Sequence, residues 1–290
     1  MIKKVSKFFR LLRSDKPADK IFLKRRLFSL PLIGSFLGWC DKLKASLTQR
    51  SPEDYVKMQK LNYDLYAAAD QISAGSIEGD YVVGSWQAHD QWGDYNDYLM
   101  KYVPRNESWL ALDYGCGPGR NLRRWSSIFA RIDGVDIAQK NLENARVFLR
   151  DLPPAKKPNL FLTDGMDCGD ALKNNYDFAF STICLQHICV YDVRYSILKN
   201  LFSCLKPDGR ISIQMGYGVP SPLTVSYREN FFAAVGTNRL ADVAISSPDE
   251  VKNDLEKIGF VAFEYWIRPV GPGDVHPHWI FFTAVKPKDA

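Results

Sequence analysis

The stretch that most constrains this chain is WLALDYGCGPGRNL, residues 109–122, where a short apolar run meets an acid and three alternating glycines. The apolar run ends at Asp113, glycines follow at positions 115, 117 and 119, and a polar segment opens at Arg120. Glycine tolerates positive φ and has no Cβ, so backbone N–H groups can approach a ligand closely. The partly positive start of a following helix favours the same contact. The pattern predicts a strand, a tight ligand-binding loop and a helix.

Two details separate this loop from the dinucleotide fingerprint G-x-G-x-x-G/A. Arg120 occupies the position at which that fingerprint has a small residue. Asp113, at the carboxyl end of the predicted strand, would repel a pyrophosphate but pair well with an ammonium group. The expected ligand therefore carries a positive charge near the glycine loop.

A second acid stands where a nucleotide would need one. Residues 130–135 are predicted to form a short strand that ends at Asp136, 23 residues after Asp113. A βαβ unit brings an acid to the ribose hydroxyls at about this separation. The alternative is a surface acid that merely ends a strand. Ile137 follows directly and is expected to lie against the adenine of such a nucleotide.

Residues 113–119, DYGCGPG, resemble the first motif of class I S-adenosylmethionine-dependent methyltransferases. The resemblance continues through residue 214, with a strand predicted at 159–163, an apolar strand YDFAFS at 176–181, and the segment LQHI after it. It implies a doubly wound, Rossmann-like α/β fold whose seven-stranded sheet is mostly parallel with an antiparallel last strand. It also implies S-adenosyl-L-methionine as the cofactor, and an adenine contact at Asp164. The cofactor-binding residues expected are Asp113, Gly115, Gly117, Gly119, Asp136, Ile137, Asp164, Gly165 and Ser181.

His187 has two interpretations. As the catalytic residue it would be a general base near the methyl donor, because imidazole exchanges protons near neutral pH. As a structural residue it would orient a loop or cap a helix through hydrogen bonds. The sequence leaves both interpretations open.

The expected acceptor side draws on three loop segments. Trp86 and His89 lie in a segment that, in the resembled family, often closes over the cofactor. Tyr217 begins an irregular aromatic stretch, about 215–245, expected to cover the carboxyl ends of the strands or simply to shield the sheet edge. His276 and His278 join the last two predicted strands, 261–267 and 278–285. No clear third ligand accompanies this histidine pair, so no metal is predicted.

Charge divides the chain into an arm and a body. Residues 1–50 hold 13 Lys and Arg against three Asp, whereas residues 51–290 hold 25 against 30 acids. The mildly acidic body disfavours nucleic acid as a partner. We expect a basic arm (1–50), a helical and aromatic cap segment (51–84), and a methyltransferase domain (85–290).

The arm itself predicts a basic amphipathic helix, with Val5, Phe8, Phe9 and Leu12 at helical spacing. The apolar run at 27–40 is too short to cross a bilayer of ~30 Å. An anionic membrane surface is one predicted partner; a solvated extension or a helix packed on the body are the alternatives. Six cysteines without a C-x-x-C spacing indicate a reducing compartment. The expected localisation is cytoplasmic, with the inner face of a membrane as the alternative if the arm binds there.

The function expected from these features is methyl transfer from S-adenosylmethionine to a hydroxyl of a small molecule or of a glycan- or lipid-linked precursor. Two alternatives stay open. One is a non-catalytic protein that binds the same cofactor on the same scaffold, since fold alone does not establish activity. The other is an NAD-dependent oxidoreductase, which would share the sheet.

Overall fold

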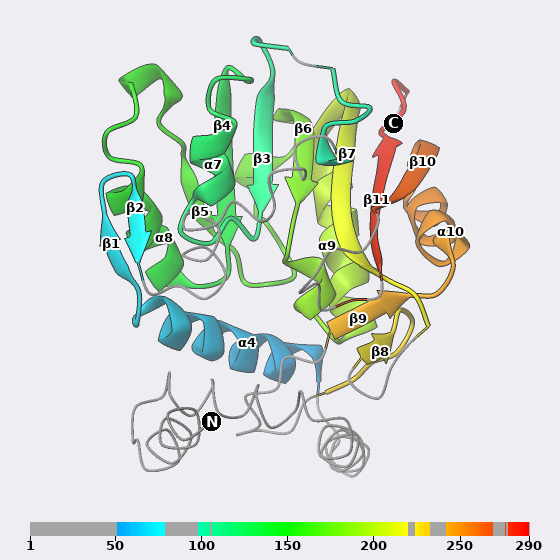
Figure 1. Ribbon diagram of the computed structural model, residues 1–290. Coiled ribbons are helices and arrows are strands. Elements are labelled where there is room, and N and C mark those ends of the chain that lie inside the picture. Colours follow the sequence, from blue (N-terminus) through cyan, green and yellow to red (C-terminus); the bar gives the residue numbers. More distant parts are fainter. Residues whose placement is uncertain are drawn as a thin grey trace, which may run out of the picture.

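The computed structural model of the chain describes residues 51–78, 98–104, 106–219, 224–232, 242–268, 276 and 278–289. The basic arm, Trp86 and His89 lie outside these residues. In the described part, a twisted sheet stands at the centre with helices on both faces (Figure 1).

Seven strands follow one path through the sheet, in the order β5-β4-β3-β6-β7-β11-β10. The pairs from β5 to β7 are parallel, while β11 is antiparallel to both β7 and β10. This confirms the predicted doubly wound fold with an antiparallel last strand. The strands are β3 (Leu110–Tyr114), β4 (Arg131–Asp136), β5 (Leu160–Leu162), β6 (Tyr176–Ser181), β7 (Leu205–Tyr217), β10 (Val261–Arg268) and β11 (His278–Val285).

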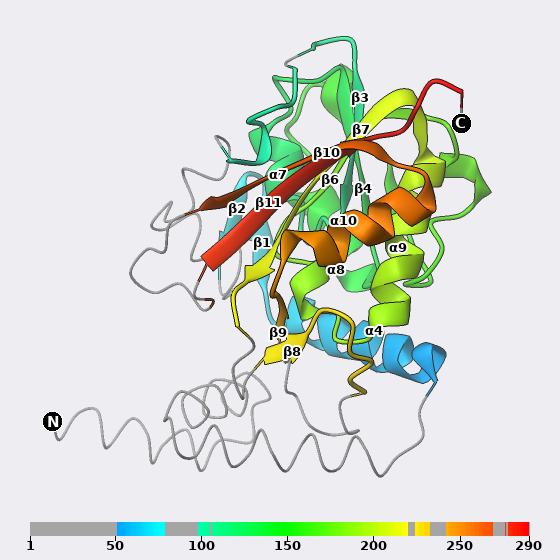
Figure 2. The ribbon, with the colours of Figure 1, turned by 90° about the vertical axis from the view of Figure 1, so that its right-hand side faces the viewer.

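Alternation along the strands builds two apolar layers, because successive strand residues point to opposite faces. Phe178 and Phe180 of β6 face the layer that holds α7 and α8, whereas Ala179 faces the layer that holds α9 and α10. The two helix layers lie on opposite sides of the sheet (Figure 2). The helices are α7 (Arg120–Arg124), α8 (Gln139–Phe148), α9 (Tyr191–Cys204) and α10 (Pro248–Ile258), with short 3-10 turns η1 (Pro154–Lys156), η2 (Asp170–Leu172) and η3 (Leu185–His187).

A further helix, α4 (Pro52–Ala67), crosses the carboxyl ends of the parallel strands (Figure 1). The Asp64 carboxylate accepts a hydrogen bond from the Lys140 backbone N–H at 3.0 Å, in the first turn of α8. The Asn144 side chain of α8 donates to the Ala67 carbonyl at 2.8 Å. These bonds fix α4 at the edge where ligands of open α/β sheets bind. The hairpin β1 (Gln71–Ser73) and β2 (Ser76–Glu78) follows it.

The stretch at 215–245 is more regular than the sequence suggested. It contains β8 (Thr224–Ser226) and β9 (Asp242–Ile245), which pair in parallel with each other. β7 extends past the last β6 pair, Ser181 with Ile213, and β9 pairs with the β7 residues Gly216 and Tyr217. Backbone groups that would otherwise be unpaired therefore find partners. A four-residue strand gives too short a pattern to be recognised from sequence.

Candidate functional site

The glycine loop after β3 is tied to the end of β4. The N–H groups of Gly115 and Cys116 both donate to the Val135 carbonyl, at 2.8 and 3.0 Å. The Gly117 N–H donates to the Asp136 carboxylate at 2.8 Å. Gly117 has a φ of +54°, and a Cβ there would meet no atom within 4 Å. The main chain therefore borders open space at Gly117, as a ligand-binding loop requires. α7 has only five residues, so the loop rather than a helix dipole forms this border.

Asp113 is a buried carboxylate without a hydrogen-bond partner among the described residues. Its side chain is 1% exposed. Burial raises the pKa of Asp113 to about 7, although the Arg120 charge and the Asn121 side chain oppose that shift. A bound ammonium group would supply the missing donor.

Asp136 is held by three protein donors. In addition to Gly117, its carboxylate accepts from the Ala138 N–H at 2.8 Å and from the Asn141 side chain at 3.2 Å. Burial raises the pKa of Asp136, and these hydrogen bonds partly offset the shift. Because each carboxylate oxygen can accept two bonds, capacity for a ribose hydroxyl remains. Repulsion from Asp136 contributes to the raised pKa of Asp113, so the two acids lie near each other.

The residues expected around adenine also lie together. Asp164 is exposed, and one of its oxygens accepts from the N–H groups of Met166 and Asp167 at 2.8 and 2.7 Å. At Gly165, a Cβ would lie 2.5 Å from the Val56 side chain of α4 and 2.8 Å from the Ile137 side chain. Glycine thus allows α4, the end of β4 and the loop after β5 to meet.

Ser181 lies deeper than its expected role requires. Its side chain is fully buried, and its hydroxyl donates to the Tyr114 carbonyl at 2.8 Å. The hydroxyl therefore joins the ends of β6 and β3. The expected contact of Ser181 with the methionine end of a cofactor stays a prediction.

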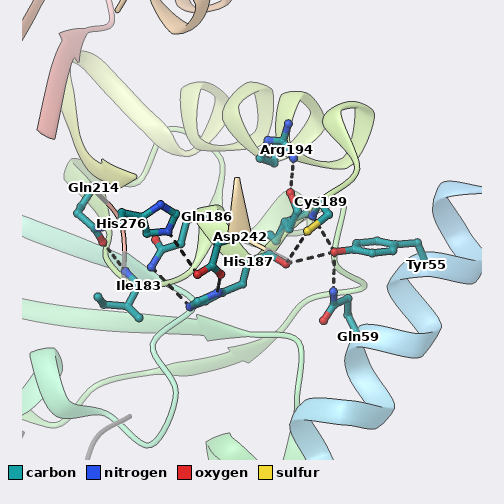
Figure 3. Close-up of polar contacts among 11 residues, drawn as sticks. Tyr55, Gln59, Ile183, Gln186, His187, Cys189, Arg194, Gln214, Asp242 and His276 are labelled. Atoms are coloured by element: carbon teal, nitrogen blue, oxygen red, sulfur yellow. Dashed lines mark hydrogen bonds and ion pairs between the residues drawn. The ribbon is translucent and has the colours of Figure 1, made fainter. Parts of the chain in front are cut away.

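His187 belongs to a cluster of two imidazoles and one carboxylate (Figure 3). Its Nδ1 lies 2.6 Å from Oδ1 of Asp242, the first residue of β9. Oδ2 of the same carboxylate lies 3.3 Å from Nε2 of His276. Burial opposes ionisation of Asp242, but the two imidazoles hold its pKa well below the usual range. The cluster therefore keeps a charged acceptor beside His187.

Of the other expected acceptor residues, His276 turns inward and His278 does not. His276 is 1% exposed, whereas His278 is exposed at the start of β11. Tyr217 is the register partner of His278, and their ring centroids are 6.4 Å apart. Trp86 and His89, the predicted lid residues, lie outside the described ranges.

Sequence reasoning missed Asp242 and two tyrosines of α4. The Tyr55 hydroxyl donates to the His187 carbonyl at 3.2 Å and accepts from the Cys189 N–H at 2.8 Å (Figure 3). Burial raises the pKa of Tyr63, and Cys184, Asp242 and Asp136 add to the shift, so Tyr63 lies near both of these acids. The only signal in the sequence was the tyrosine-rich spacing of residues 55–66.

The described residues lack two other kinds of feature. None of their His, Cys, Asp and Glu side chains form a group of three or more that could hold a metal ion. None of the helices among them has the length and apolar character needed to cross a membrane.

Residues 111–209 match the family model of a methyltransferase domain. This part of the chain is therefore similar to a methyltransferase domain, in agreement with the resemblance that the sequence predicted. The chain is 32% identical over 122 residues to trans-aconitate 2-methyltransferase of Enterobacter sp. (strain 638). The match covers 41% of this chain and 43% of that relative, less than half the length of each.

Solved structures share the fold of this chain. One is the 1,6-didemethyltoxoflavin-N1-methyltransferase of Burkholderia thailandensis with bound 1,6-didemethyltoxoflavin and S-adenosylhomocysteine. It is 18% identical, with a TM-score of 0.54 over 83% of this chain and 92% of its own. Another is a methyltransferase from Methanosarcina mazei, 20% identical, with a TM-score of 0.51 over 66% of this chain and 98% of its own. At these identities, the likeness shows the fold.

Proposed function

We propose that this chain binds S-adenosylmethionine and transfers its methyl group to an oxygen of a small-molecule acceptor. The observation that carries the proposal is the Asp113 carboxylate, which has no hydrogen-bond partner among the described residues. The open main chain at Gly117 and the remaining acceptor capacity of Asp136 support it. An amino acid joined to a nucleoside matches these groups, since an ammonium pairs with the first acid and ribose hydroxyls with the second. A diphosphate would be repelled by both.

Each predicted cofactor residue takes one part of this ligand. Asp113 binds the α-amino group, the loop from Gly115 to Gly119 borders the methionine and ribose, and Asp136 accepts from the ribose. Ile137 lies against the adenine, Asp164 accepts from its amine, and Gly165 leaves room for both. When bound, the cofactor supplies a methyl group already activated by the positive sulfur. The chain aligns the acceptor and excludes water, effects worth up to ~7–11 kcal/mol.

An oxygen acceptor is favoured by the geometry at His187. A weakly acidic hydroxyl must lose its proton as it attacks, and an imidazole backed by a charged carboxylate is a suitable base. His187 takes that role in the proposal. The small size of the acceptor is supported by the relatives, whose names specify trans-aconitate and 1,6-didemethyltoxoflavin.

A glycan- or lipid-linked acceptor is a narrower proposal that depends on the basic arm, residues 1–50. If the arm holds the protein on an anionic membrane surface, deleting it will abolish sedimentation with phosphatidylglycerol vesicles and leave S-adenosylhomocysteine binding intact. If the truncated chain sediments with the vesicles as the full chain does, the proposal of a membrane-linked acceptor loses its support.

Titration calorimetry followed by a transfer assay tests the main proposal. The chain should bind S-adenosylhomocysteine and not NAD, and should transfer labelled methyl from S-adenosylmethionine to a compound in a small-molecule extract. Binding without transfer to any extract would support a non-catalytic cofactor-binding protein. Binding of NAD without S-adenosylhomocysteine would support an oxidoreductase and contradict the proposal.

A further inference from the structure

Three segments far apart in the sequence meet at one carboxylate. Asp242 begins β9, His187 ends η3 and His276 precedes β11. The three side chains lie together although they are far apart in the sequence (Figure 3). Both carboxylate oxygens have an imidazole nitrogen close by, at 2.6 Å for His187 and 3.3 Å for His276. The carboxylate thus joins the two rings.

The two rings differ in access. The His187 side chain keeps 20% of its surface exposed, whereas that of His276 has none. His276 is enclosed by Trp279, whose ring centroid is 4.7 Å away, and by Gly216, where a Cβ would lie 2.3 Å from the imidazole. Of the two rings, only His187 is open to a ligand. Both His276 nitrogens are buried without a hydrogen-bond partner among the described residues, and the Asp242 carboxylate lies 3.3 Å from Nε2.

Neighbouring groups specify which nitrogen of His187 carries the proton. An ionised carboxylate can only accept, so the close contact with Asp242 requires the N–H at Nδ1. The Gln186 amide nitrogen, which can only donate, lies 3.5 Å from Nε2 and favours a lone pair there. This contact is long enough to give way to an acceptor hydroxyl. Nε2 therefore keeps the lone pair that can accept a proton.

The surrounding elements hold this arrangement without adding another group that titrates near neutral pH. Tyr55 fixes the turn through the His187 carbonyl. Burial raises the pKa values of Tyr55 and Tyr63 of α4 and of Cys184 in the segment after β6, so these groups stay neutral. Within the described residues packed on the cluster, the charge that backs His187 comes from Asp242.

We propose that Asp242 and His276 are positioning residues that select the Nδ1–H tautomer of His187 and thereby make Nε2 the base for the acceptor hydroxyl. This inference rests on the proposed methyl transfer. In the step, His187 Nε2 takes the hydroxyl proton while the acceptor oxygen bonds to the methyl carbon. The carbon–sulfur bond breaks with its electron pair on sulfur, which leaves S-adenosylhomocysteine. The sulfur becomes neutral, and the positive charge then resides on the imidazolium that forms beside Asp242.

Histidine nitrogen NMR on the full chain tests the tautomer without an acceptor. The chain has four histidines, and a His187→Asn variant assigns the signal. We expect His187 to be predominantly Nδ1–H at pH 8, to shift toward Nε2–H in Asp242→Asn, and to shift less in His276→Asn. Asp170→Asn, at a carboxylate whose side chain is 89% exposed, is the control and should change nothing. A wild-type His187 that is mainly Nε2–H overturns the inference even if a variant fails to fold.

Kinetics on the identified acceptor give the second readout. Asp242→Asn should lower kcat by about 10²–10⁴-fold, the contribution of a positioned base, with little change in the dissociation constant of S-adenosylhomocysteine. The acid limb of its kcat/KM profile should move to lower pH, because a protonated imidazole loses its counter-charge. An unchanged kcat and pH profile, with the cofactor still bound, contradicts the positioning role alone. Failure of the wild-type chain to bind the cofactor contradicts the proposed function instead.

Discussion

Asp113 shows how one buried side chain without a hydrogen-bond donor can favour the binding of a ligand. A buried carboxylate without a donor is unfavourable in the free protein, since desolvation disfavours its charged form. A ligand with an ammonium group relieves that cost and so gains affinity from it. The same feature makes binding of the cofactor depend on pH.

We predict that the affinity for S-adenosylhomocysteine rises about tenfold between pH 6 and pH 8, as the Asp113 carboxyl, with a pKa of about 7, loses its proton. The ammonium of the ligand prefers the ionised form, so binding releases a proton in this range. Calorimetry in buffers of different ionisation enthalpy measures that release. Asp113→Asn should bind more weakly by about 1.5–3 kcal/mol and lose the pH dependence. A pH dependence retained in this variant would falsify the assignment to Asp113.

Gly117 offers a second test at single-residue scale. Gly117→Ala places a methyl group in the open space beside the loop and should reduce S-adenosylhomocysteine affinity more than tenfold, measured by calorimetry. Gly75→Ala is the matched control, because Gly75 also has positive φ, +70°, and room for a Cβ, but lies in the β1–β2 hairpin. Both variants should lose about 1–2 kcal/mol of stability from backbone strain. Equal cofactor affinity in the two variants would contradict the placement of the loop.

Sequence reasoning located the acids at 113 and 136 because each one ends an apolar strand, and the strand order then brings them together. It could not locate Asp242, since this acid follows a stretch without hydrophobic periodicity. Nor could it separate His276 from His278, because a loop of unknown path leaves open which ring turns inward. Contacts of this kind depend on chain geometry that no local pattern records.

At the scale of elements, α4 is part of the site rather than a lid above it. Its Tyr55 hydroxyl joins the helix to η3, and its Val56 packs on Gly165 after β5. A tyrosine stripe on a helix is typical of core packing, so the sequence predicted a helical segment here but not these contacts. The predicted helix and its contacts with the strand ends together position both His187 and the loop after β5.

Tyr55→Phe should destabilise the chain by about 1–3 kcal/mol, because removal of the hydroxyl leaves the Cys189 N–H and the Gln59 amide without their acceptor. Urea unfolding followed by circular dichroism measures the change in midpoint. Tyr195→Phe serves as the control, since the structure records only a ring contact for Tyr195, with Tyr191. If both variants unfold at the same urea concentration, Tyr55 does not fix α4.

For the whole molecule, the buried Asp113 carboxyl links the stability of the fold to ligand binding. The folded chain holds the Asp113 proton up to about pH 7, whereas an unfolded chain releases it near pH 4. The stability of the ligand-free chain should therefore fall as pH rises between these values. By the same reasoning, Asp113→Asn should raise Tm, and by more at pH 8 than at pH 5.

Thermal unfolding with and without S-adenosylhomocysteine measures how much ligand binding stabilises the chain. Wild type should gain about 2.7 kcal/mol at a ligand concentration 100 times its dissociation constant, and Asp113→Asn should gain less at the same concentration. A lower Tm for the variant at pH 8 without ligand would show that the ionised carboxylate stabilises the free chain, contrary to the prediction.

The position of β9 has a consequence for how such a protein can change its substrate. Asp242 belongs to the insertion that follows β7, not to the strands that hold the glycine loop and Asp136. An evolutionary exchange of this insertion would alter which molecules fit and, in the same event, delete or supply the carboxylate behind His187. Substrate choice and proton removal would then diversify together, while the nucleoside half of the protein is inherited unchanged.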